Sequence, residues 1–158
     1  LSRGLGDVYK RQGPNPWPYP ICIAEVWAEK VPKVILESGW SDPEDWGVWA
    51  EGLHSNAEWI AFAQKDHILR IGAFPLCVPG QHQQISVKVN GKEIGSYQWK
   101  ECELWEAEIP IPKSLIQIGW NEFSFDYAYA FSPAEVTQGQ NLDPRILSVG
   151  FTTLEVVK

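Results

Sequence analysis

QISVKVNGKEIGSYQW (residues 84–99) decides the fold class. In its first half, Ile and Val alternate with polar residues, which is the period-2 pattern of a half-buried strand. Asn90-Gly91 then supplies the two positive-φ positions of a type I′ turn. The chain returns through a second alternating segment that ends Tyr97-Gln98-Trp99, with a slip at Gly95-Ser96. The stretch therefore predicts an antiparallel β-hairpin.

Short apolar segments with turn signals between them continue on both sides of this hairpin. We expect further strands at Val34–Leu36, Glu58–Ala63, Ile68–Val78, Leu104–Ile109, Asn121–Ala128 and from Ile146 or Leu147 to Val157. The third is expected to bend at Gly72 or Pro75, and the fourth to end at Pro110 and Pro112. One helical turn is expected at Ser114–Ile118.

No segment keeps a 3.6-residue apolar period over three turns, so long helices are not expected. Short strands at this spacing are typical of sandwiches and barrels. We predict an all-β fold, a two-sheet antiparallel β-sandwich of the jelly-roll type, with the roughly eight strands of that architecture.

The chain divides into three parts by composition. Residues 1–12, LSRGLGDVYKRQ, resemble a translated sequencing-library adaptor, and we expect no function there. Residues 13–33 begin GPNPWPYP, which is too rich in proline for a helix or central strand and predicts an arm or linker. Residues 34–158 are expected to form the β-sandwich domain, since 158 residues suit a single core.

Charge excludes several classes of partner. The net charge is -7, and no basic stripe is present that could neutralise phosphates, which argues against nucleic acid and anionic membranes. The sequence contains no stretch of 18 or more apolar residues, so no membrane span is expected in it. The 9 Trp are the outlier in composition. An indole ring can fill a core or stack on a ligand, so the surplus alone does not indicate function.

The cysteines and histidines indicate no metal or cofactor. Cys22, Cys77 and Cys102 are widely spaced and odd in number, so we expect free, partly buried thiols, with one bridge as the alternative. The three histidines lie far apart and form no HxH or HExxH motif, so zinc has no support. A structural calcium is conceivable in a sandwich, but no DxDxDG string supports it.

The loop at 39–52, GWSDPEDWGVWAEG, is the most unusual stretch. Its tryptophans alternate with carboxylates, and a sugar site needs both kinds of side chain. The rings stack on the apolar face of a pyranose, while the carboxylates accept hydrogen bonds from its hydroxyl groups. The alternative is that Trp46 and Trp49 plug the end of the sandwich while Asp42-Pro43-Glu44 begins a helical turn.

Arg145 precedes the last expected strand. It either reaches into a ligand site or tethers its loop to an acidic residue such as Glu44 or Asp143. The candidate ligand-binding residues are Trp40, Asp42, Glu44, Trp46, Trp49 and Arg145.

Catalysis is the least favoured hypothesis. A small glycoside hydrolase could use Glu44 or Asp42, because two carboxyl groups are its minimum requirement. However, such clefts are usually assembled from separated strand ends, and these residues share one loop. The sequence also contains no GxSxG nucleophile elbow. We therefore expect no catalytic residues and no enzyme activity.

Four stretches in this order resemble a known type of domain: GWSDPEDWGVWAEG, VKVNGKEIGSYQW, EIPIPKSLIQIGWNEFSFDYAYAFSPAEV and DPRILSVGFTTLEV. They resemble an accessory jelly-roll domain of bacterial envelope proteins, similar to galactose-binding-like sandwich modules and appended to membrane sugar transferases or sulfatase-like enzymes. The resemblance covers about residues 34–157. It implies the sandwich fold, an extracytoplasmic location in the periplasm or at the cell surface, and an association with carbohydrate.

Two hypotheses of different classes follow. The first is a non-catalytic, carbohydrate-associated accessory module, part of a larger envelope protein. The second is a structural packing domain that orients an adjacent enzyme or membrane domain of the same chain and binds no small ligand. The first predicts two or more exposed tryptophans on a common concave face. The second predicts that Trp40, Trp46, Trp49 and Trp59 are all buried.

Overall fold

Alternation of apolar and polar residues determines where the strands form. In the computed structural model, which describes residues 34–158, β5 (Gln84–Val89) and β6 (Lys92–Gln98) form the expected hairpin. Asn90-Gly91 has the two positive φ angles of a type I′ turn, 48° and 80°. The pairing slips by one residue after Val87, where β6 contributes an extra residue as a bulge.

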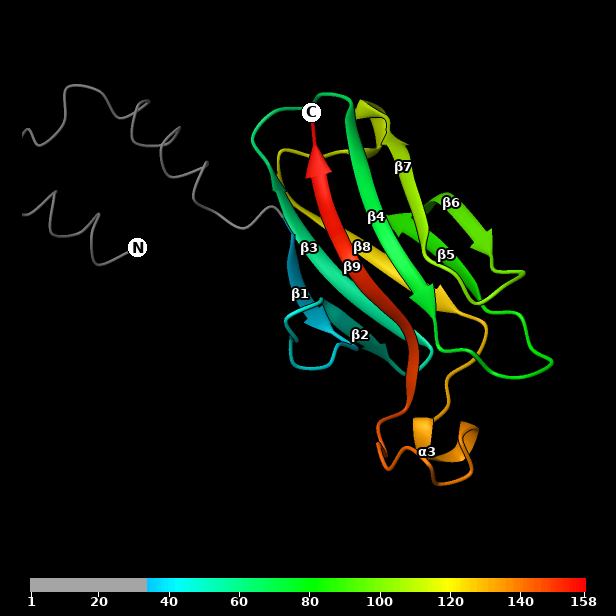
Figure 1. Ribbon diagram of the computed structural model, residues 1–158. Helices are drawn as coiled ribbons and strands as arrows, with labels where there is room; N and C mark the ends of the chain where they lie inside the picture. The colour runs from blue at the N-terminus through cyan, green and yellow to red at the C-terminus, as the bar shows by residue number, and fades with distance from the viewer. Residues whose placement is uncertain (1–33) are drawn as a thin grey trace, which may run out of the picture. The chain divides into compact units, whose positions relative to one another are not determined.

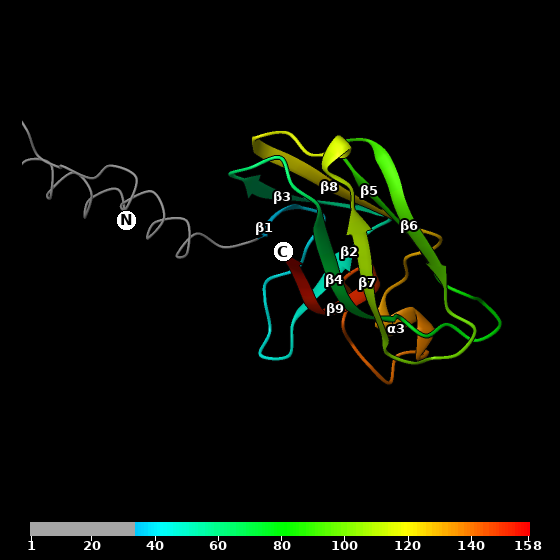
Figure 2. The same cartoon turned by 90° about the horizontal axis from the view of Figure 1, so that it is seen from above.

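The remaining elements complete a two-layer sandwich. They are the strands β1 (Ile35–Ser38), β2 (Val48–Glu51), β3 (His54–Ala61), β4 (His67–Pro75), β7 (Trp105–Ile111), β8 (Gly119–Tyr127) and β9 (Leu147–Val157), with the helical turns η1 (Lys113–Leu115) and α3 (Pro133–Val136). One sheet has the order β1-β3-β8-β5-β6 and the other β2-β9-β4-β7. Figures 1 and 2 show the sheets as separate layers, with β9, β4 and β7 turned toward the viewer in Figure 1.

The connections confirm the jelly-roll prediction. All strand pairs are antiparallel. Each strand is followed by a strand of the opposite sheet, except at the β5–β6 hairpin. The chain therefore crosses between layers at both ends of the sandwich, and loops from both sheets gather there.

The core lies between the two sheets. Alternate residues of β3, β5 and β8 are buried, among them Phe123, Phe125 and Trp59. Each fully buried aromatic or branched side chain contributes about 1.5–3 kcal/mol relative to leaving it in water. This burial fixes the register, because a one-residue slip would turn the apolar set outward.

Three expectations about the elements need correction. Residues 39–52 are not all loop, since β2 occupies Val48–Glu51 and pairs with β9. β3 begins at His54, four residues earlier than expected. β7 continues through Pro110, which an edge strand tolerates because its outer side needs no backbone N–H donors.

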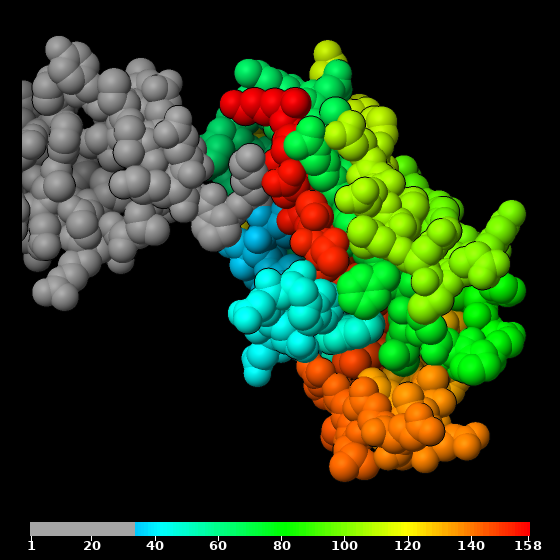
Figure 3. Space-filling view, in the orientation of Figure 1, coloured from blue at the N-terminus to red at the C-terminus, as the bar shows by residue number. Residues whose placement is uncertain are grey.

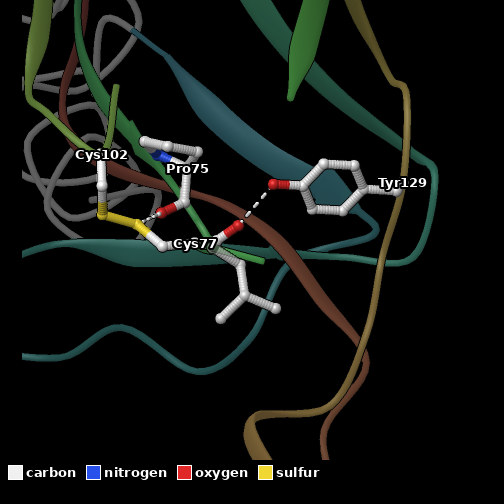
Figure 4. The surroundings of a disulfide bond; sticks show 5 residues. Pro75, Cys77, Cys102 and Tyr129 are labelled. Carbon is white, nitrogen blue, oxygen red and sulfur yellow. Dashed lines mark hydrogen bonds between the residues drawn. A yellow bond between two sulfur atoms is a disulfide. The ribbon is translucent and has the colours of Figure 1, made fainter. Parts of the chain in front are cut away.

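The cysteine expectation is also wrong for two residues. Cys77 and Cys102 form a disulfide with Cα atoms 5.8 Å apart (Figure 4). Both residues are exposed. The loops that carry them are brought together by the hairpin, where the Trp99 amide donates to the Gln83 carbonyl oxygen at 2.9 Å. Nearby, the Tyr129 hydroxyl donates to the Leu76 carbonyl oxygen at 2.7 Å.

The predictions for the adaptor-like segment, the proline-rich arm and Cys22 lie outside the described residues. Within residues 34–158, no helix is long and apolar enough to cross a membrane.

Candidate functional site

Three aromatic rings gather on the outer face of the four-stranded sheet. Trp49 on β2 and Phe74 on β4 both face Gly150, which lies between them on β9. Because Gly150 has no side chain, the two rings meet across it with centroids 5.2 Å apart. Trp46 completes the group, 5.5 Å from Trp49 and 5.2 Å from Phe74. We call Trp46, Trp49 and Phe74 the aromatic platform.

A tight turn ahead of β2 places Trp46 on this face. The backbone groups of Glu44 and Gly47 bond to each other in both directions, at 2.7 and 3.1 Å. Gly47 has a φ of 150°, and a Cβ there would collide with the Phe151 backbone oxygen on β9. The turn can therefore lie directly against the sheet. In Figures 1 and 3 this segment, in cyan, lies beside the red β9 strand.

Trp46 is the exposed member of the platform. Its residue is 36% exposed, and its indole N–H donates to Glu44 Oε2 at 2.8 Å. Trp49 and Phe74 are half-buried beneath and beside it. The hydrogen bond and the neighbouring rings hold the Trp46 ring in one orientation, so an apolar surface is offered to solvent in a fixed position.

A charged cluster lies next to the platform. Arg145 forms a fork on Asp143, with NH2 2.6 Å from Oδ2 and Nε 3.0 Å from Oδ1, and both terminal nitrogens lie 3.4 Å from Glu44 Oε1. Hydrogen bonds from the Arg145 side chain and then its backbone amide hold the pKa of Asp143 below its usual range. The same pairing raises the pKa of Arg145. These contacts are the ones expected if Arg145 tethers its loop to the acidic residues Glu44 and Asp143.

Trp40 does not join the platform. It turns inward, where its ring packs edge-on against Phe125 and Phe151 at 5.8 and 5.2 Å, and its N–H donates to the Asn56 carbonyl oxygen at 2.6 Å. Its assignment as a ligand-stacking residue therefore lacks geometric support. Asp42 is exposed in the segment before the turn. The helical turn that the alternative interpretation placed at Asp42-Pro43-Glu44 is not formed, and the chain instead makes a tight turn closed by Glu44 and Gly47.

The sequence interpretation missed the rest of this face. Phe74 was assigned only to a strand, although the alternation Arg70, Gly72, Phe74 on β4 could have placed it outward beside the tryptophans. A hollow of about 270 Å³ lies over Gly72, between Thr153 on β9 and Glu106 on β7. The hollow at Gly72 therefore lies next to the platform residue Phe74 along β4.

A larger hollow, of about 320 Å³, lies at the disulfide-linked loops. We favour the platform as the candidate site because the indole of Trp99, which lines that hollow, belongs to a residue only 1% exposed. A ring buried in the core offers no open face on which a ligand could stack.

Tryptophan exposure fits neither hypothesis in its simple form. Trp46 and Trp120 are both exposed, but Trp120 lies on β8 of the other sheet, so they share no face. The packing hypothesis predicted that Trp46 would be buried, and this is wrong. Within residues 34–158, no group of three or more His, Cys, Asp or Glu side chains could hold a metal ion.

No family model matches the sequence, and no curated protein matches it at a significant level. Solved structures are similar in fold. The CBM36-1 domain of a multidomain xylanase from the hindgut metagenome of Trinervitermes trinervoides is 9% identical, with a TM-score of 0.46 over 79% of this chain and 95% of that domain. A family 35 carbohydrate binding module from Clostridium thermocellum is 14% identical, with a TM-score of 0.40 over 79% of this chain and 88% of its own.

An acetyl xylan esterase from the rumen bacterium Butyrivibrio proteoclasticus is 11% identical, with a TM-score of 0.46 over 82% of this chain and 30% of the esterase.

Proposed function

We propose that the domain is a non-catalytic glycan-binding module and that the aromatic platform is its sugar-contacting surface. One observation carries this proposal: Trp46 is an exposed indole held in place by Glu44, Trp49 and Phe74. A fixed, exposed ring stacks on the apolar face of a sugar at low entropic cost. The adjacent oxygens of Glu44 and the exposed Asp45 can accept hydrogen bonds from sugar hydroxyl groups.

The charged cluster supports a binding role over hydrolysis. A glycosidase needs a general acid whose pKa is raised toward the working pH. Here the pKa of Asp143 is shifted the other way by Arg145, and Glu44 is engaged by both Trp46 and the same guanidinium. Both side chains are thereby fixed in place by hydrogen bonds.

We further propose that the module works outside the cytoplasm as an accessory to another domain. The Cys77–Cys102 bond supports the location, because disulfides persist chiefly in oxidising compartments. Weak stacking on a single platform becomes useful when tethering to an enzyme or membrane domain raises the local concentration.

The test is a glycan array probed with the full chain and with Trp46→Ala. We expect binding to a subset of glycans, and an affinity about ten-fold or more lower for Trp46→Ala, because the exposed ring supplies the central contact. Trp120→Ala is the matched control, since it removes an exposed indole from the other sheet. Circular dichroism of each variant checks folding.

If the full chain binds no glycan on the array, the proposal is contradicted. Equal loss in Trp46→Ala and Trp120→Ala would show that the platform is not the site.

A second candidate function has its own observation. Phe62, Ile118 and Trp120 are exposed by 56%, 72% and 48% where β3 ends and β8 begins. Such a patch suits the packing hypothesis, in which a neighbouring domain covers it. If this is its only role, Trp120→Ala disturbs the assembly while Trp46→Ala has no effect.

A further inference from the structure

The face that carries the platform extends along β4. Phe74, Gly72 and Arg70 are alternate residues on this strand, so they point to the same side. Successive outward positions are separated by about 7 Å along the strand. The platform, the hollow and Arg70 therefore form one line, which a chain of sugars could follow and a single sugar could not.

Because position 72 has no side chain, two threonines of β9 can lie close to the β4 backbone beside the hollow. A Cβ built on Gly72 would lie 2.6 Å from Thr152 Oγ1 and 3.3 Å from Thr153 Oγ1. A bulge in β9 places both threonines opposite this glycine, since the register shifts between Gly72 and Ala73. The Thr153 hydroxyl thus borders a hollow of about 270 Å³ and can donate or accept a hydrogen bond.

The far end of the line is rich in carboxylates. Arg70 donates from Nε to Glu108 at 2.8 Å and from NH1 to Glu155 at 3.5 Å. Glu106, which also lines the hollow, is exposed, and among residues 34–158 it has no ion-pair partner. Its carboxylate remains available to accept hydrogen bonds from a ligand.

Both guanidinium groups on this face are already engaged. Arg145 is held by Asp143 and Glu44 at one end, and Arg70 by Glu108 and Glu155 at the other. A negatively charged sugar would therefore meet surplus carboxylate charge without a free cation to offset it. Uncharged or positively charged sugars meet no such repulsion.

We propose that the ligand is an oligosaccharide of uncharged or amino sugars, bound along β4 from the aromatic platform across the Gly72 hollow to Arg70 and Glu106. This inference rests on the proposed function and adds the length and charge of the glycan. Uronic acid and sulfated chains are excluded from the site.

The experiment is isothermal titration of the full chain with glucose, xylose and mannose oligosaccharides, from the monosaccharide to the hexasaccharide. Glucosamine and galacturonic acid oligosaccharides of matched length complete the panel. We expect affinity to rise at least about ten-fold from monosaccharide to hexasaccharide in a series that binds, as added contacts along the line predict. We expect the galacturonic acid series to bind weakest.

Variants separate the hollow from the platform. Glu106→Gln and Thr153→Val keep the size of exposed side chains that line the hollow and change only their polar atoms. We expect each to weaken hexasaccharide binding while leaving the affinity for the shortest ligand that binds unchanged. Glu122→Gln, an exposed carboxylate on the other sheet, is the matched control and should leave both unchanged.

The outcomes distinguish the two claims. If Trp46→Ala removes binding but affinity is independent of length, or the hollow variants bind the hexasaccharide normally, the inference fails and the proposed function stands. Preferred binding of galacturonic acid chains would also overturn the inference. If no glycan in the panel or on the array binds, the proposed function fails as well.

Discussion

Gly150 is the residue on which the aromatic platform depends. It separates Trp49 from Phe74 on neighbouring strands, and a Cβ at this position would lie 2.5 Å from Phe74 Cζ. The two rings can contact each other only because this side chain is absent. The platform is thus a product of strand pairing across β9, and local sequence around either ring does not reveal it.

Gly150→Ala should displace the Phe74 ring. We expect a loss of about 1–3 kcal/mol in the free energy of unfolding, the usual cost of overpacking, measured by urea denaturation. Because Phe74→Ala removes the obstructing ring, Gly150→Ala should cost less in that background. Additive effects of the two substitutions would mean that the ring does not occupy the space above Gly150.

Asp143 should make stability depend on pH. Its folded pKa is lowered by Arg145, so the fold favours the ionised carboxylate. The resulting stabilisation is fully present above the unfolded pKa of about 3.9 and is lost as pH falls through the lower folded value. Asp143→Asn should therefore reduce the melting temperature at neutral pH, and the difference from wild type should shrink in acid.

The effect of Asp143→Asn should be modest, because the Arg145 side chain is partly exposed and its charge is screened. A difference between Asp143→Asn and wild type that stays constant down to strongly acidic pH would contradict the assignment.

At the scale of elements, strands with strong local signals were predicted well. The β5–β6 hairpin follows from Asn90-Gly91, and β8 follows from its alternating aromatic residues. β2 was missed because two of its four residues are Trp49 and Glu51 and turn residues flank the segment, so that it resembles part of a loop. Only pairing with β9, about a hundred residues later, makes that segment a strand.

The disulfide is a second element-scale feature that local sequence did not reveal. Cys77 and Cys102 belong to different loops and are separated by 25 residues. Replacing both with serine, in a Cys22→Ser background that leaves no other thiol, should lower the free energy of unfolding by about 2–4 kcal/mol. Urea denaturation measures this. Reductant should lower the stability of the Cys22→Ser protein to the same level, and two titratable thiols in the native Cys22→Ser protein would refute the bond.

At the scale of the whole molecule, the fold was predictable and the site only in part. Two-sheet architecture follows from many short alternating strands, each of which adds to the same conclusion. All candidate site residues except Arg145 were predicted from one loop, but the structure divides them: Trp46 and Trp49 lie on the platform, while Trp40 packs against the core. Sequence alone could not separate Trp40 from Trp46 and Trp49, because all three tryptophans have similar residues around them.

The central claim is that a glycan contacts the Trp46 platform. The most direct measurement is a ¹⁵N spectrum of the indole N–H groups during titration with the tightest neutral oligosaccharide found on the array. We predict saturable shifts of the Trp46 and Trp49 signals, with Trp99 and Trp120 unchanged. Shifts confined to Trp99 at the loop hollow or to Trp120 on the other sheet, or no indole shift at saturation, would contradict the account.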